Sequence, residues 1–294
     1  WSSDVCSSDL RTKAAAVIAE HFGATPSQPD HTCYHTQTIR MPDGRVWKVM
    51  RDSSIPGPDD EKTEVVSPIC KWEDIETVQE LVRKLRKAGA KADPAHCGIH
   101  VHIGANGHTP QTLRNLANIM ASHENLLAEA LKLDQHRMAR YCRTVDPRFL
   151  KELNKKKPQT MDELEDIWYI SQGENYGRDH HYNGSRYRML NYHATFSKHT
   201  IEFRLFEFEA PANGKQNGIH AGRLKAYIQL CLALSEMAKE VRTASPKPQQ
   251  HENPKFAMRT WLLRLGFIGE EFATAREILT RNLSGNAAFR FGRA

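Results

Sequence analysis

The sequence contains no apolar run long enough to cross a membrane as a helix. Such a helix needs about 18 consecutive apolar residues, and the best candidate, AYIQLCLALSEMA, is shorter and interrupted by polar residues. The chain also lacks a phosphate-binding P-loop, a dinucleotide-binding glycine fingerprint and any internal repeat, since GANGH and NGKQNG match neither loop pattern. These absences argue against membrane-spanning, P-loop and repeat proteins, and we expect a cytoplasmic location.

Cysteine is sparse and shows no metal-binding or redox spacing, because none of the six cysteines forms a CxxC pair. A scattered set of this kind is typical of reduced, mostly buried thiols. The cysteines are Cys6, Cys33, Cys70, Cys97, Cys142 and Cys231.

The charge is moderately positive, with 41 Lys and Arg against 35 Asp and Glu, and a formal net charge of +6. A basic surface favours partners that carry phosphate. Nucleic acid is one such partner and a nucleotide substrate is another. Composition alone does not choose between them.

The first ten residues, WSSDVCSSDL, do not look like part of a fold. They have neither the basic start nor the apolar core of a signal peptide, and they show no helix or strand period. Their back-translation is compatible with a common short-read sequencing adapter read in frame. We therefore interpret residues 1–10 as a non-native, adapter-derived segment and expect the domain to comprise residues 11–294.

Apolar periodicity predicts helices and strands in an irregular order. Residues 146–184 are charged and loop-like apart from the helix predicted at 160–170. Because strands and helices do not alternate regularly, we expect an α+β domain with a mainly antiparallel sheet. The other predicted helices are 12–22, 73–89, 110–131, 219–241, 256–265 and 271–282, and the predicted strands are 31–40, 45–52, 63–69, 96–104, 186–194 and 199–209.

The segment CGIHVHIG alternates strictly between apolar and polar residues. In a strand, this period of two places His100 and His102 on one face and the apolar residues on the other. Two adjacent imidazoles can bind a metal ion or contact phosphate. Alternatively, they are structural histidines with hydrogen-bond partners, and the segment alone leaves both readings open.

The same argument applies to TIEFRLFE, where Glu202 and Arg204 share one face. A carboxylate beside a guanidinium is most often a plain ion pair. A histidine pair on a strand of the same sheet favours a functional role instead.

Further acidic and basic residues accompany these two strands. Glu64 lies among apolar residues in TEVVSPI and is either a metal ligand or a solvated strand end, and the latter is favoured for Asp52. We expect Arg186 and Arg188 to contact nucleotide phosphates. Carboxylates would then hold Mg²⁺ against the phosphates, while arginines neutralise the charge of the transition state.

In order and spacing, these segments resemble the amidoligases of the glutamine synthetase-like carboxylate-amine ligase superfamily. CGIHVHIG is similar to the G-M-H-x-H strand of glutamine synthetase, and TIEFRLF is similar to its E-x-R strand. The stretches DGRVWKVMRDSSI, TEVVSPI, RYRMLNYH and LRLGFIGEEFATAREILTRNLSGN also resemble the family.

This resemblance implies a glutamine synthetase-like catalytic domain, with one curved antiparallel sheet around a cleft and helices packed outside it. It also implies a ligase that uses ATP to convert a carboxylate into an acyl phosphate, which an amine then attacks to form an amide. Two divalent ions, Mg²⁺ or Mn²⁺, would hold the phosphates. The substrates would be a small-molecule or peptide carboxylate and an amine.

By the same resemblance, Glu64, His100 and Glu202 would be metal ligands. Glu202 and Arg204 would be the catalytic pair, with Arg204 stabilising the transferred phosphoryl group. His102 would contact the nucleotide or support a ligand.

The family places a G-x-E-x-E strand, with two metal-binding glutamates, just before its first helix. Residues 1–10 stand at this position. We therefore expect an N-terminally truncated fragment that lacks part of its metal site and is inactive unless such a strand is joined before Arg11.

Two other function classes remain open. The HxH strand also occurs in metal-dependent hydrolases, although these usually have a β/α barrel that the irregular spacing does not support. The basic composition and the tract KELNKKKP are compatible with a nucleic-acid-binding protein. A charge run is more often a solvated face, however, and no nucleic-acid motif accompanies it.

Overall fold

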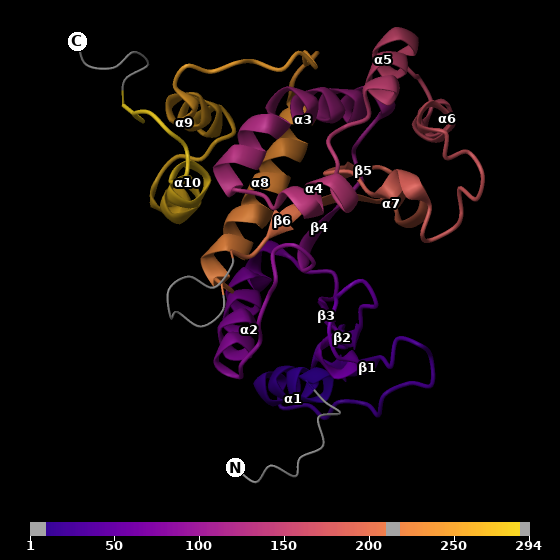
Figure 1. The fold of residues 1–294 in the computed structure, drawn as a ribbon, viewed down its shortest axis with the longest axis vertical. Coiled ribbons are helices and arrows are strands. Elements are labelled where there is room, and N and C mark those ends of the chain that lie inside the picture. Colours follow the sequence, from indigo (N-terminus) through magenta and orange to yellow (C-terminus); the bar gives the residue numbers. More distant parts are fainter. Residues whose placement is uncertain (1–9, 210–217, 289–294) are drawn as a thin grey trace. The chain divides into compact units, whose positions relative to one another are not determined.

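The computed structural model describes residues 10–209 and 218–288, which form two compact units (Figure 1). Unit 1 contains the described residues up to Cys97 and those of Phe208–Ala221, and unit 2 contains Gly98–Glu207 and the described residues from Gly222 onward. Residues 1–9 of the predicted non-native segment lie outside the described residues, and Leu10 begins the first helix. The predicted extent of the domain, 11–294, stays a prediction.

Unit 1 combines a three-stranded antiparallel sheet, in the order β1-β2-β3, with two helices. The predicted hairpin is confirmed, since Ile39 pairs with Trp47 and the Met41 N–H donates to the Arg45 carbonyl oxygen in the turn. The elements are α1 (Leu10–Phe22), β1 (Gln37–Arg40), β2 (Val46–Arg51), the 3-10 turn η1 (Asp59–Glu61), β3 (Thr63–Val66), the 3-10 turn η2 (Trp72–Asp74) and α2 (Ile75–Lys87).

A small apolar core holds unit 1 together. Ile18 of α1 is buried against Ile39, Trp47 and Val49 of β1 and β2, and Leu81 of α2 completes the cluster. These strand positions share one face because strand side chains alternate with a period of two. The apolar pattern of the sequence therefore predicts the buried face of this sheet correctly.

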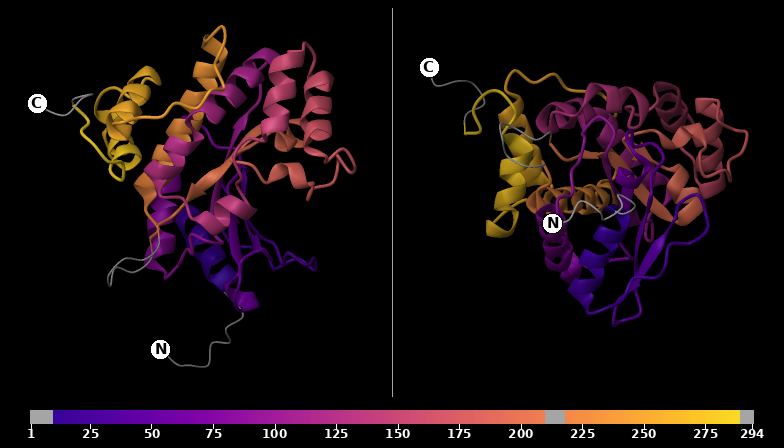
Figure 2. Two further views of the ribbon diagram at one scale, coloured as in Figure 1. Left: turned by 45° about the horizontal axis from the view of Figure 1, so that its top comes forward. Right: turned by 60° about the horizontal axis from the view of Figure 1, so that its bottom comes forward.

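Unit 2 contains a second antiparallel sheet, in the order β4-β6-β5, and helices that pack around it. Its strands are β4 (Gly98–Gly104), β5 (Leu190–Asn191) and β6 (Thr200–Glu207). Helices α9 and α10, in yellow, lie beside each other at one edge of the unit (Figure 2). The helices are α3 (Pro110–Leu131), α4 (Gln135–Arg140), α5 (Pro147–Lys156), α6 (Met161–Gln172), α7 (His193–Lys198), α8 (Ala221–Glu240), α9 (Pro254–Arg264) and α10 (Ala273–Thr280), and the 3-10 turns are η3 (Gly184–Arg186) and η4 (Glu270–Phe272).

One large apolar core fills unit 2. Val101 and Ile103 of β4 are buried with Phe203 of β6 and with Leu113 and Leu116 of α3. The alternate positions of β4 consequently face away from this core. The polar face of the sheet is therefore set by where the apolar residues pack.

The structure corrects the predicted sheet. The α+β class and the antiparallel pairing are confirmed, but the described residues form two three-stranded sheets rather than one curved sheet. The consecutive strands β3 and β4 are separated by η2 and α2 and pair with different partners. The cleft and the glutamine synthetase-like fold stay predictions.

Two local predictions are also wrong. Residues 146–184 are not mostly loop, because Asp146 caps the first turn of α5 by accepting two of its backbone N–H groups. The strand predicted over 186–194 is reduced to Leu190–Asn191, since the Asn191 side chain accepts the N–H of His193, where α7 begins.

The tract KELNKKKP lies largely on α5. Phe149 and Leu153 bury one side of this helix, whereas Lys151, Lys155 and Lys156 are exposed. The basic run is thus the solvated face of an amphipathic helix.

The exposure of the cysteines and the character of the helices bear on two further predictions, buried thiols and the absence of a membrane-spanning helix. Cys142 and Cys231 are buried, but Cys33 and Cys70 are exposed, so the prediction of mostly buried thiols is wrong. Cys6 lies outside the described residues. Within residues 10–209 and 218–288, no helix has the length and apolar character that a membrane span requires.

Candidate functional site

Four side chains of β4 and β6 meet on the polar face of the second sheet. Oε1 of Glu202 lies 3.5 Å from Nδ1 of His100, 3.5 Å from Nε2 of His102 and 2.7 Å from Nη1 of Arg204. In the strand register, His102 is the direct partner of Glu202. The four residues therefore share one face, as the strand period predicts, while their roles stay predictions.

A β-bulge lies between β4 and β6 at the position of Arg204. Ile99 pairs with Phe206, but Val101 pairs with Phe203, so that one residue of β4, His100, faces two residues of β6. Bulges of this kind bend a strand and re-aim its side chains, and they are frequent next to active sites. The two β6 residues at the bulge are Arg204 and Leu205.

A buried arginine satisfies the two carbonyl groups of the bulge. Arg137 of α4 donates to the carbonyl oxygens of Arg204 at 2.6 Å and Leu205 at 3.0 Å, and it lies 3.5 Å from the Glu207 carboxylate. A Cβ atom on Gly98 would collide with Nη2 of Arg137, so a larger residue here would displace the guanidinium group. Arg137 thus stabilises the bulge from the side of the core.

Glu202 is a buried carboxylate that stays ionised. Only 4% of its side chain is exposed. Burial raises its pKa, but the hydrogen bond with His102 and the charges of Arg204 and His100 outweigh burial and hold the pKa well below its ordinary value. The site therefore contains a fixed negative charge surrounded by donors.

The two histidines differ in their surroundings. Desolvation, followed by the positive charge of Arg204, lowers the pKa of His100 well below its ordinary value, although 30% of the side chain is accessible to solvent. His100 is therefore a neutral imidazole near pH 7, the form that binds metal ions. Nδ1 of His102 lies 3.0 Å from Thr200 Oγ1, which directs Nε2 towards Glu202.

Arg204 has unused hydrogen-bonding capacity. Its side chain is 5% exposed, and its buried Nε atom has no hydrogen-bond partner among the residues that the structure describes. A buried N–H without a partner is unfavourable by about 1–3 kcal/mol. Arg204 is therefore the donor of this face that an anionic ligand would satisfy.

Arg186 also belongs to this part of the molecule. Its guanidinium carbon lies 5.8 Å from the centre of the Tyr187 ring, and that of Arg204 lies 5.7 Å from the same ring. Burial lowers the pKa of Arg186, and so does the charge of Arg204, whereas Glu202 raises it. Arg186 consequently lies near Arg204, and its predicted phosphate contact stays a prediction.

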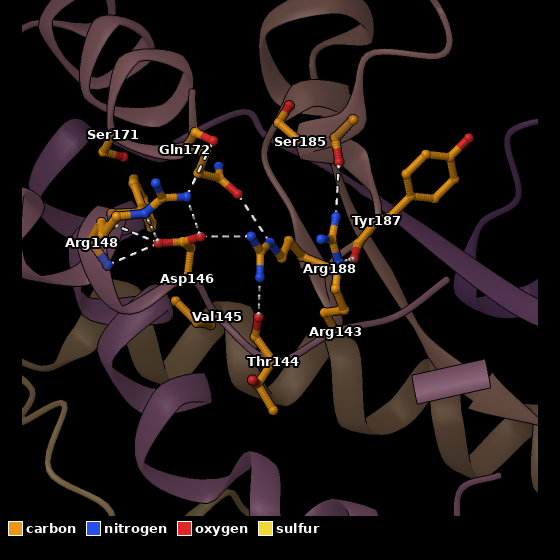
Figure 3. Close-up of polar contacts among 12 residues, drawn as sticks. Arg143, Thr144, Val145, Asp146, Arg148, Ser171, Gln172, Ser185, Tyr187 and Arg188 are labelled. Atoms are coloured by element: carbon orange, nitrogen blue, oxygen red, sulfur yellow. Dashed lines mark hydrogen bonds and ion pairs between the residues drawn. The ribbon is translucent and has the colours of Figure 1, made fainter. Parts of the chain in front are cut away.

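Arg188 lies in a different set of contacts (Figure 3). It donates to Asp146 at 2.7 Å, to the Gln172 side chain at 3.0 Å and to the Thr144 carbonyl oxygen at 3.0 Å, and Asp146 also contacts Arg148. All three nitrogens of the Arg188 guanidinium group are therefore engaged by the protein itself. The structure shows a structural clamp at Arg188, and its predicted phosphate contact gains no support.

Glu64 lies on β3 of unit 1, paired with Met50 of β2. Its predicted role as a metal ligand stays a prediction, and so does the reading of Asp52 as a solvated strand end. The Asp52 carboxylate accepts the N–H and the hydroxyl of Ser54, as expected for a residue that ends a strand and begins a turn.

Sequence reasoning missed three residues of the site. Asn191 of β5 donates to Oε2 of Glu202 at 2.5 Å, and its side-chain oxygen accepts the N–H of His193 at 2.9 Å. The imidazole Nδ1 of His193 lies 2.6 Å from the hydroxyl of Tyr169 of α6. The sequence did contain a sign that Asn191 is a site residue, because this polar residue lies between the apolar Leu190 and Tyr192.

For a divalent ion, unit 2 offers two imidazoles and one carboxylate. In the part of the chain that the structure describes, no group of three or more His, Cys, Asp or Glu is arranged to hold a metal ion. The donor types nevertheless fit an ion that accepts both nitrogen and oxygen, which favours Mn²⁺ over Mg²⁺. Metal binding at His100 and Glu202 is thus compatible with the donor chemistry.

A family model described as "putative amidoligase enzyme" matches residues 10–235. The chain belongs to this amidoligase family. The match includes β4, β5 and β6, and hence all the residues that contact Glu202. Searches of curated proteins and of solved structures found no match.

Membership of the amidoligase family supports a ligase. The sequence resemblance to this family is confirmed. The polar face of the second sheet is thereby the candidate active site of an amidoligase, since it gathers the HxH and ExR segments on which the resemblance depends.

Proposed function

We propose that the protein is an ATP-dependent carboxylate-amine ligase that forms an amide through an acyl phosphate. One observation carries the proposal: within the family match, Oε1 of Glu202 is contacted by His100, His102 and Arg204 on one strand face. The guanidinium of this set is suited to stabilising phosphate charge, and the carboxylate is suited to holding a divalent ion. The proposed reaction uses both properties.

In this reaction, a carboxylate oxygen attacks the γ-phosphorus of ATP, and the bond to the bridging oxygen of ADP breaks. The amine then attacks the carbonyl carbon of the acyl phosphate, loses a proton and expels inorganic phosphate. Arg204 and Arg186 would stabilise the negative charge on the transferred phosphoryl group. Such preorganised donors are often the largest single contribution to catalysis.

A divalent ion, when bound, would neutralise phosphate charge. His100 and Glu202 would hold it in unit 2. His102 would contact the nucleotide. Manganese is the preferred probe because imidazole belongs to the donor set.

Hydroxylamine gives a test that does not require the natural amine, because it converts an acyl phosphate into a stable hydroxamate and free phosphate. The chain with a G-x-E-x-E strand joined before Arg11, which supplies the missing part of the predicted metal site, would be incubated with Mn²⁺, ATP, hydroxylamine and a panel of carboxylic acids. We expect hydroxamate and ADP in equal amounts with at least one acid. Release of an acid from amides or esters without ATP would instead indicate a hydrolase and overturn the proposal.

A matched pair of variants connects this activity to the site. Glu202→Ala should abolish hydroxamate formation. Glu236→Ala removes a glutamate of α8 whose side chain is 64% exposed and should leave the activity unchanged. Wild-type turnover by Glu202→Ala would show that Glu202 is only a structural ion-pair partner.

A further inference from the structure

The two oxygens of Glu202 have different surroundings. Oε1 lies against His100, His102 and Arg204, whereas Oε2 accepts a single short hydrogen bond of 2.5 Å from the side-chain amide of Asn191. A carboxylate contacted only through Oε1 could turn about its terminal bond, because that torsion is broad and roughly two-fold. The contact at Oε2 therefore fixes the plane of the carboxylate, and with it the direction in which the other oxygen faces the histidines.

The orientation of the Asn191 side-chain amide is determined by the backbone two residues further along the chain. It is the direct register partner of Glu202 across β5 and β6. Its Oδ1 accepts the N–H of His193 at 2.9 Å. Because an asparagine amide has one acceptor end and one donor end, this bond directs the NH₂ group towards Glu202.

The segment that holds Asn191 is itself fixed from α6. The His193 ring is buried, its Nδ1 lies 2.6 Å from the Tyr169 hydroxyl, and the two rings meet edge to face at 5.8 Å. A side chain held by packing and hydrogen bonds at both ends loses little further freedom when it holds a third group. The contacts thus run from α6 through α7 and β5 to the carboxylate on β6.

We propose that Asn191 is a positioning residue, which orients Glu202 so that Oε1 faces His100 and His102. This inference rests on the proposed function, because the orientation of Glu202 matters for activity only if Glu202 takes part in the phosphate and metal chemistry of that face. Among the described residues, the Asn191 amide bonds Glu202 and the His193 N–H and neither imidazole of β4, so it acts on that face through Glu202. Groups that orient metal-binding side chains typically change metal affinity about 10- to 100-fold when they are removed.

The test uses Asn191→Ser. The serine hydroxyl can still accept the N–H two residues on, as in other short polar turns, but it is too short to reach Glu202. We expect a crystal structure of this variant to show the Glu202 carboxylate rotated away from its wild-type orientation. Without nucleotide, we expect the Mn²⁺ dissociation constant of the 294-residue chain to rise about 10- to 100-fold.

Asn183→Ser is the matched control. Asn183 is buried, and its side-chain oxygen also accepts the N–H two residues on, from Ser185 at 3.0 Å. Its amide donates to backbone carbonyls, including those of Glu174 and Gly177, rather than to a site residue. We expect Asn183→Ser to change thermal stability but neither Mn²⁺ affinity nor the orientation of Glu202.

The outcomes separate this inference from the proposed function. An unchanged Glu202 orientation in Asn191→Ser, or equal Mn²⁺ affinities for the variant and the wild type, would overturn the positioning role. If the wild-type chain binds no Mn²⁺, the metal part of the proposed function fails, and the crystal structure still decides the role of Asn191. Should Asn191→Ser not fold, Asn191→Asp keeps the acceptor for His193 and should turn Glu202 away by repulsion between the two carboxylates.

Discussion

At the scale of single residues, Arg204 combines three features that an ordinary ion pair does not need. Its side chain is almost fully buried, it bonds the ionised Glu202, and its Nε keeps a buried N–H without a partner. A purely structural arginine in a core would engage each of its three nitrogens, as Arg188 does. The difference between the two arginines points to a ligand at Arg204.

Arg204→Lys tests this difference. Lysine keeps the charge but loses the planar fork that can bond Glu202 and a phosphate together. We expect kcat for hydroxamate formation to fall at least about 100-fold, with a melting temperature close to that of the wild type. Arg276→Lys in α10, where the arginine donates only to backbone carbonyls, is the control. Unchanged kcat in Arg204→Lys would contradict the phosphoryl role.

Glu124 of α3 gives a prediction about pH. Burial raises its pKa to about 7, although it accepts the Val145 N–H and lies near the charge of Arg188. Since the folded state binds this proton more tightly than the unfolded state does, the contribution of Glu124 to stability is largest below about pH 4.5 and falls as the pH rises through about 7. Glutamine keeps an oxygen for Val145 and carries no proton to lose.

We therefore expect Glu124→Gln to be more stable than the wild type above about pH 8, by up to about 3 kcal/mol, with a smaller difference near pH 5. Urea unfolding across this range measures the effect. Burial also raises the pKa of Glu207 to about 7, so Glu207 lowers the free energy of unfolding with rising pH in both proteins alike. Glu129→Gln, on the exposed side of α3, is the control. Parallel pH profiles for Glu124→Gln and the wild type would contradict the prediction.

At the scale of elements, the bulge in β6 depends on Arg137. This arginine is 1% exposed and is the recorded partner of two bulge carbonyls and of the Glu207 carboxylate. Removing one partner of a buried ion pair is destabilising by about 3–5 kcal/mol. We expect a loss of this size in Arg137→Met, measured by urea unfolding, with faster amide exchange in β4 and β6.

Arg140→Met, on the exposed side of the same helix, should be nearly neutral. Measured at pH 8 or above, adding Glu207→Gln to Arg137→Met should recover part of the loss, because it removes a buried carboxyl group that has lost its cationic partner. If the double variant is no more stable than Arg137→Met, the carbonyl groups rather than Glu207 account for the effect.

The same strands show what the sequence can and cannot predict. The period of two placed His100 with His102 and Glu202 with Arg204 correctly, because side-chain direction in a strand follows from backbone geometry alone. The bulge could not be predicted, since it depends on a buried arginine that is distant in sequence. Helix α5 was missed because its apolar stripe is short and lies among lysines, and Asn191 was missed because its role depends on the pairing of β5 with β6.

At the scale of the whole molecule, the sequence analysis did not predict that the described residues form two units with separate sheets. Each helix and strand was inferred from local patterns, but which strands pair is decided by packing. The two apolar clusters share no residue: one contains Ile18, Ile39 and Trp47, and the other contains residues of β4, β6 and α3. Separate cores allow separate unfolding, so a single two-state transition is not to be assumed.

Hydrogen exchange after one core substitution in each unit tests this independence. Ile39 in β1 and Leu127 in α3 are both fully buried, and truncation of such residues to alanine is destabilising by about 2–5 kcal/mol. We expect Ile39→Ala to accelerate amide exchange in α1 and β1–β3 while α3 and α8 keep wild-type protection, because local opening depends on the core that each segment packs against. Leu127→Ala should give the opposite pattern. Equal acceleration in both units from either substitution would show that the two cores unfold as one cooperative unit.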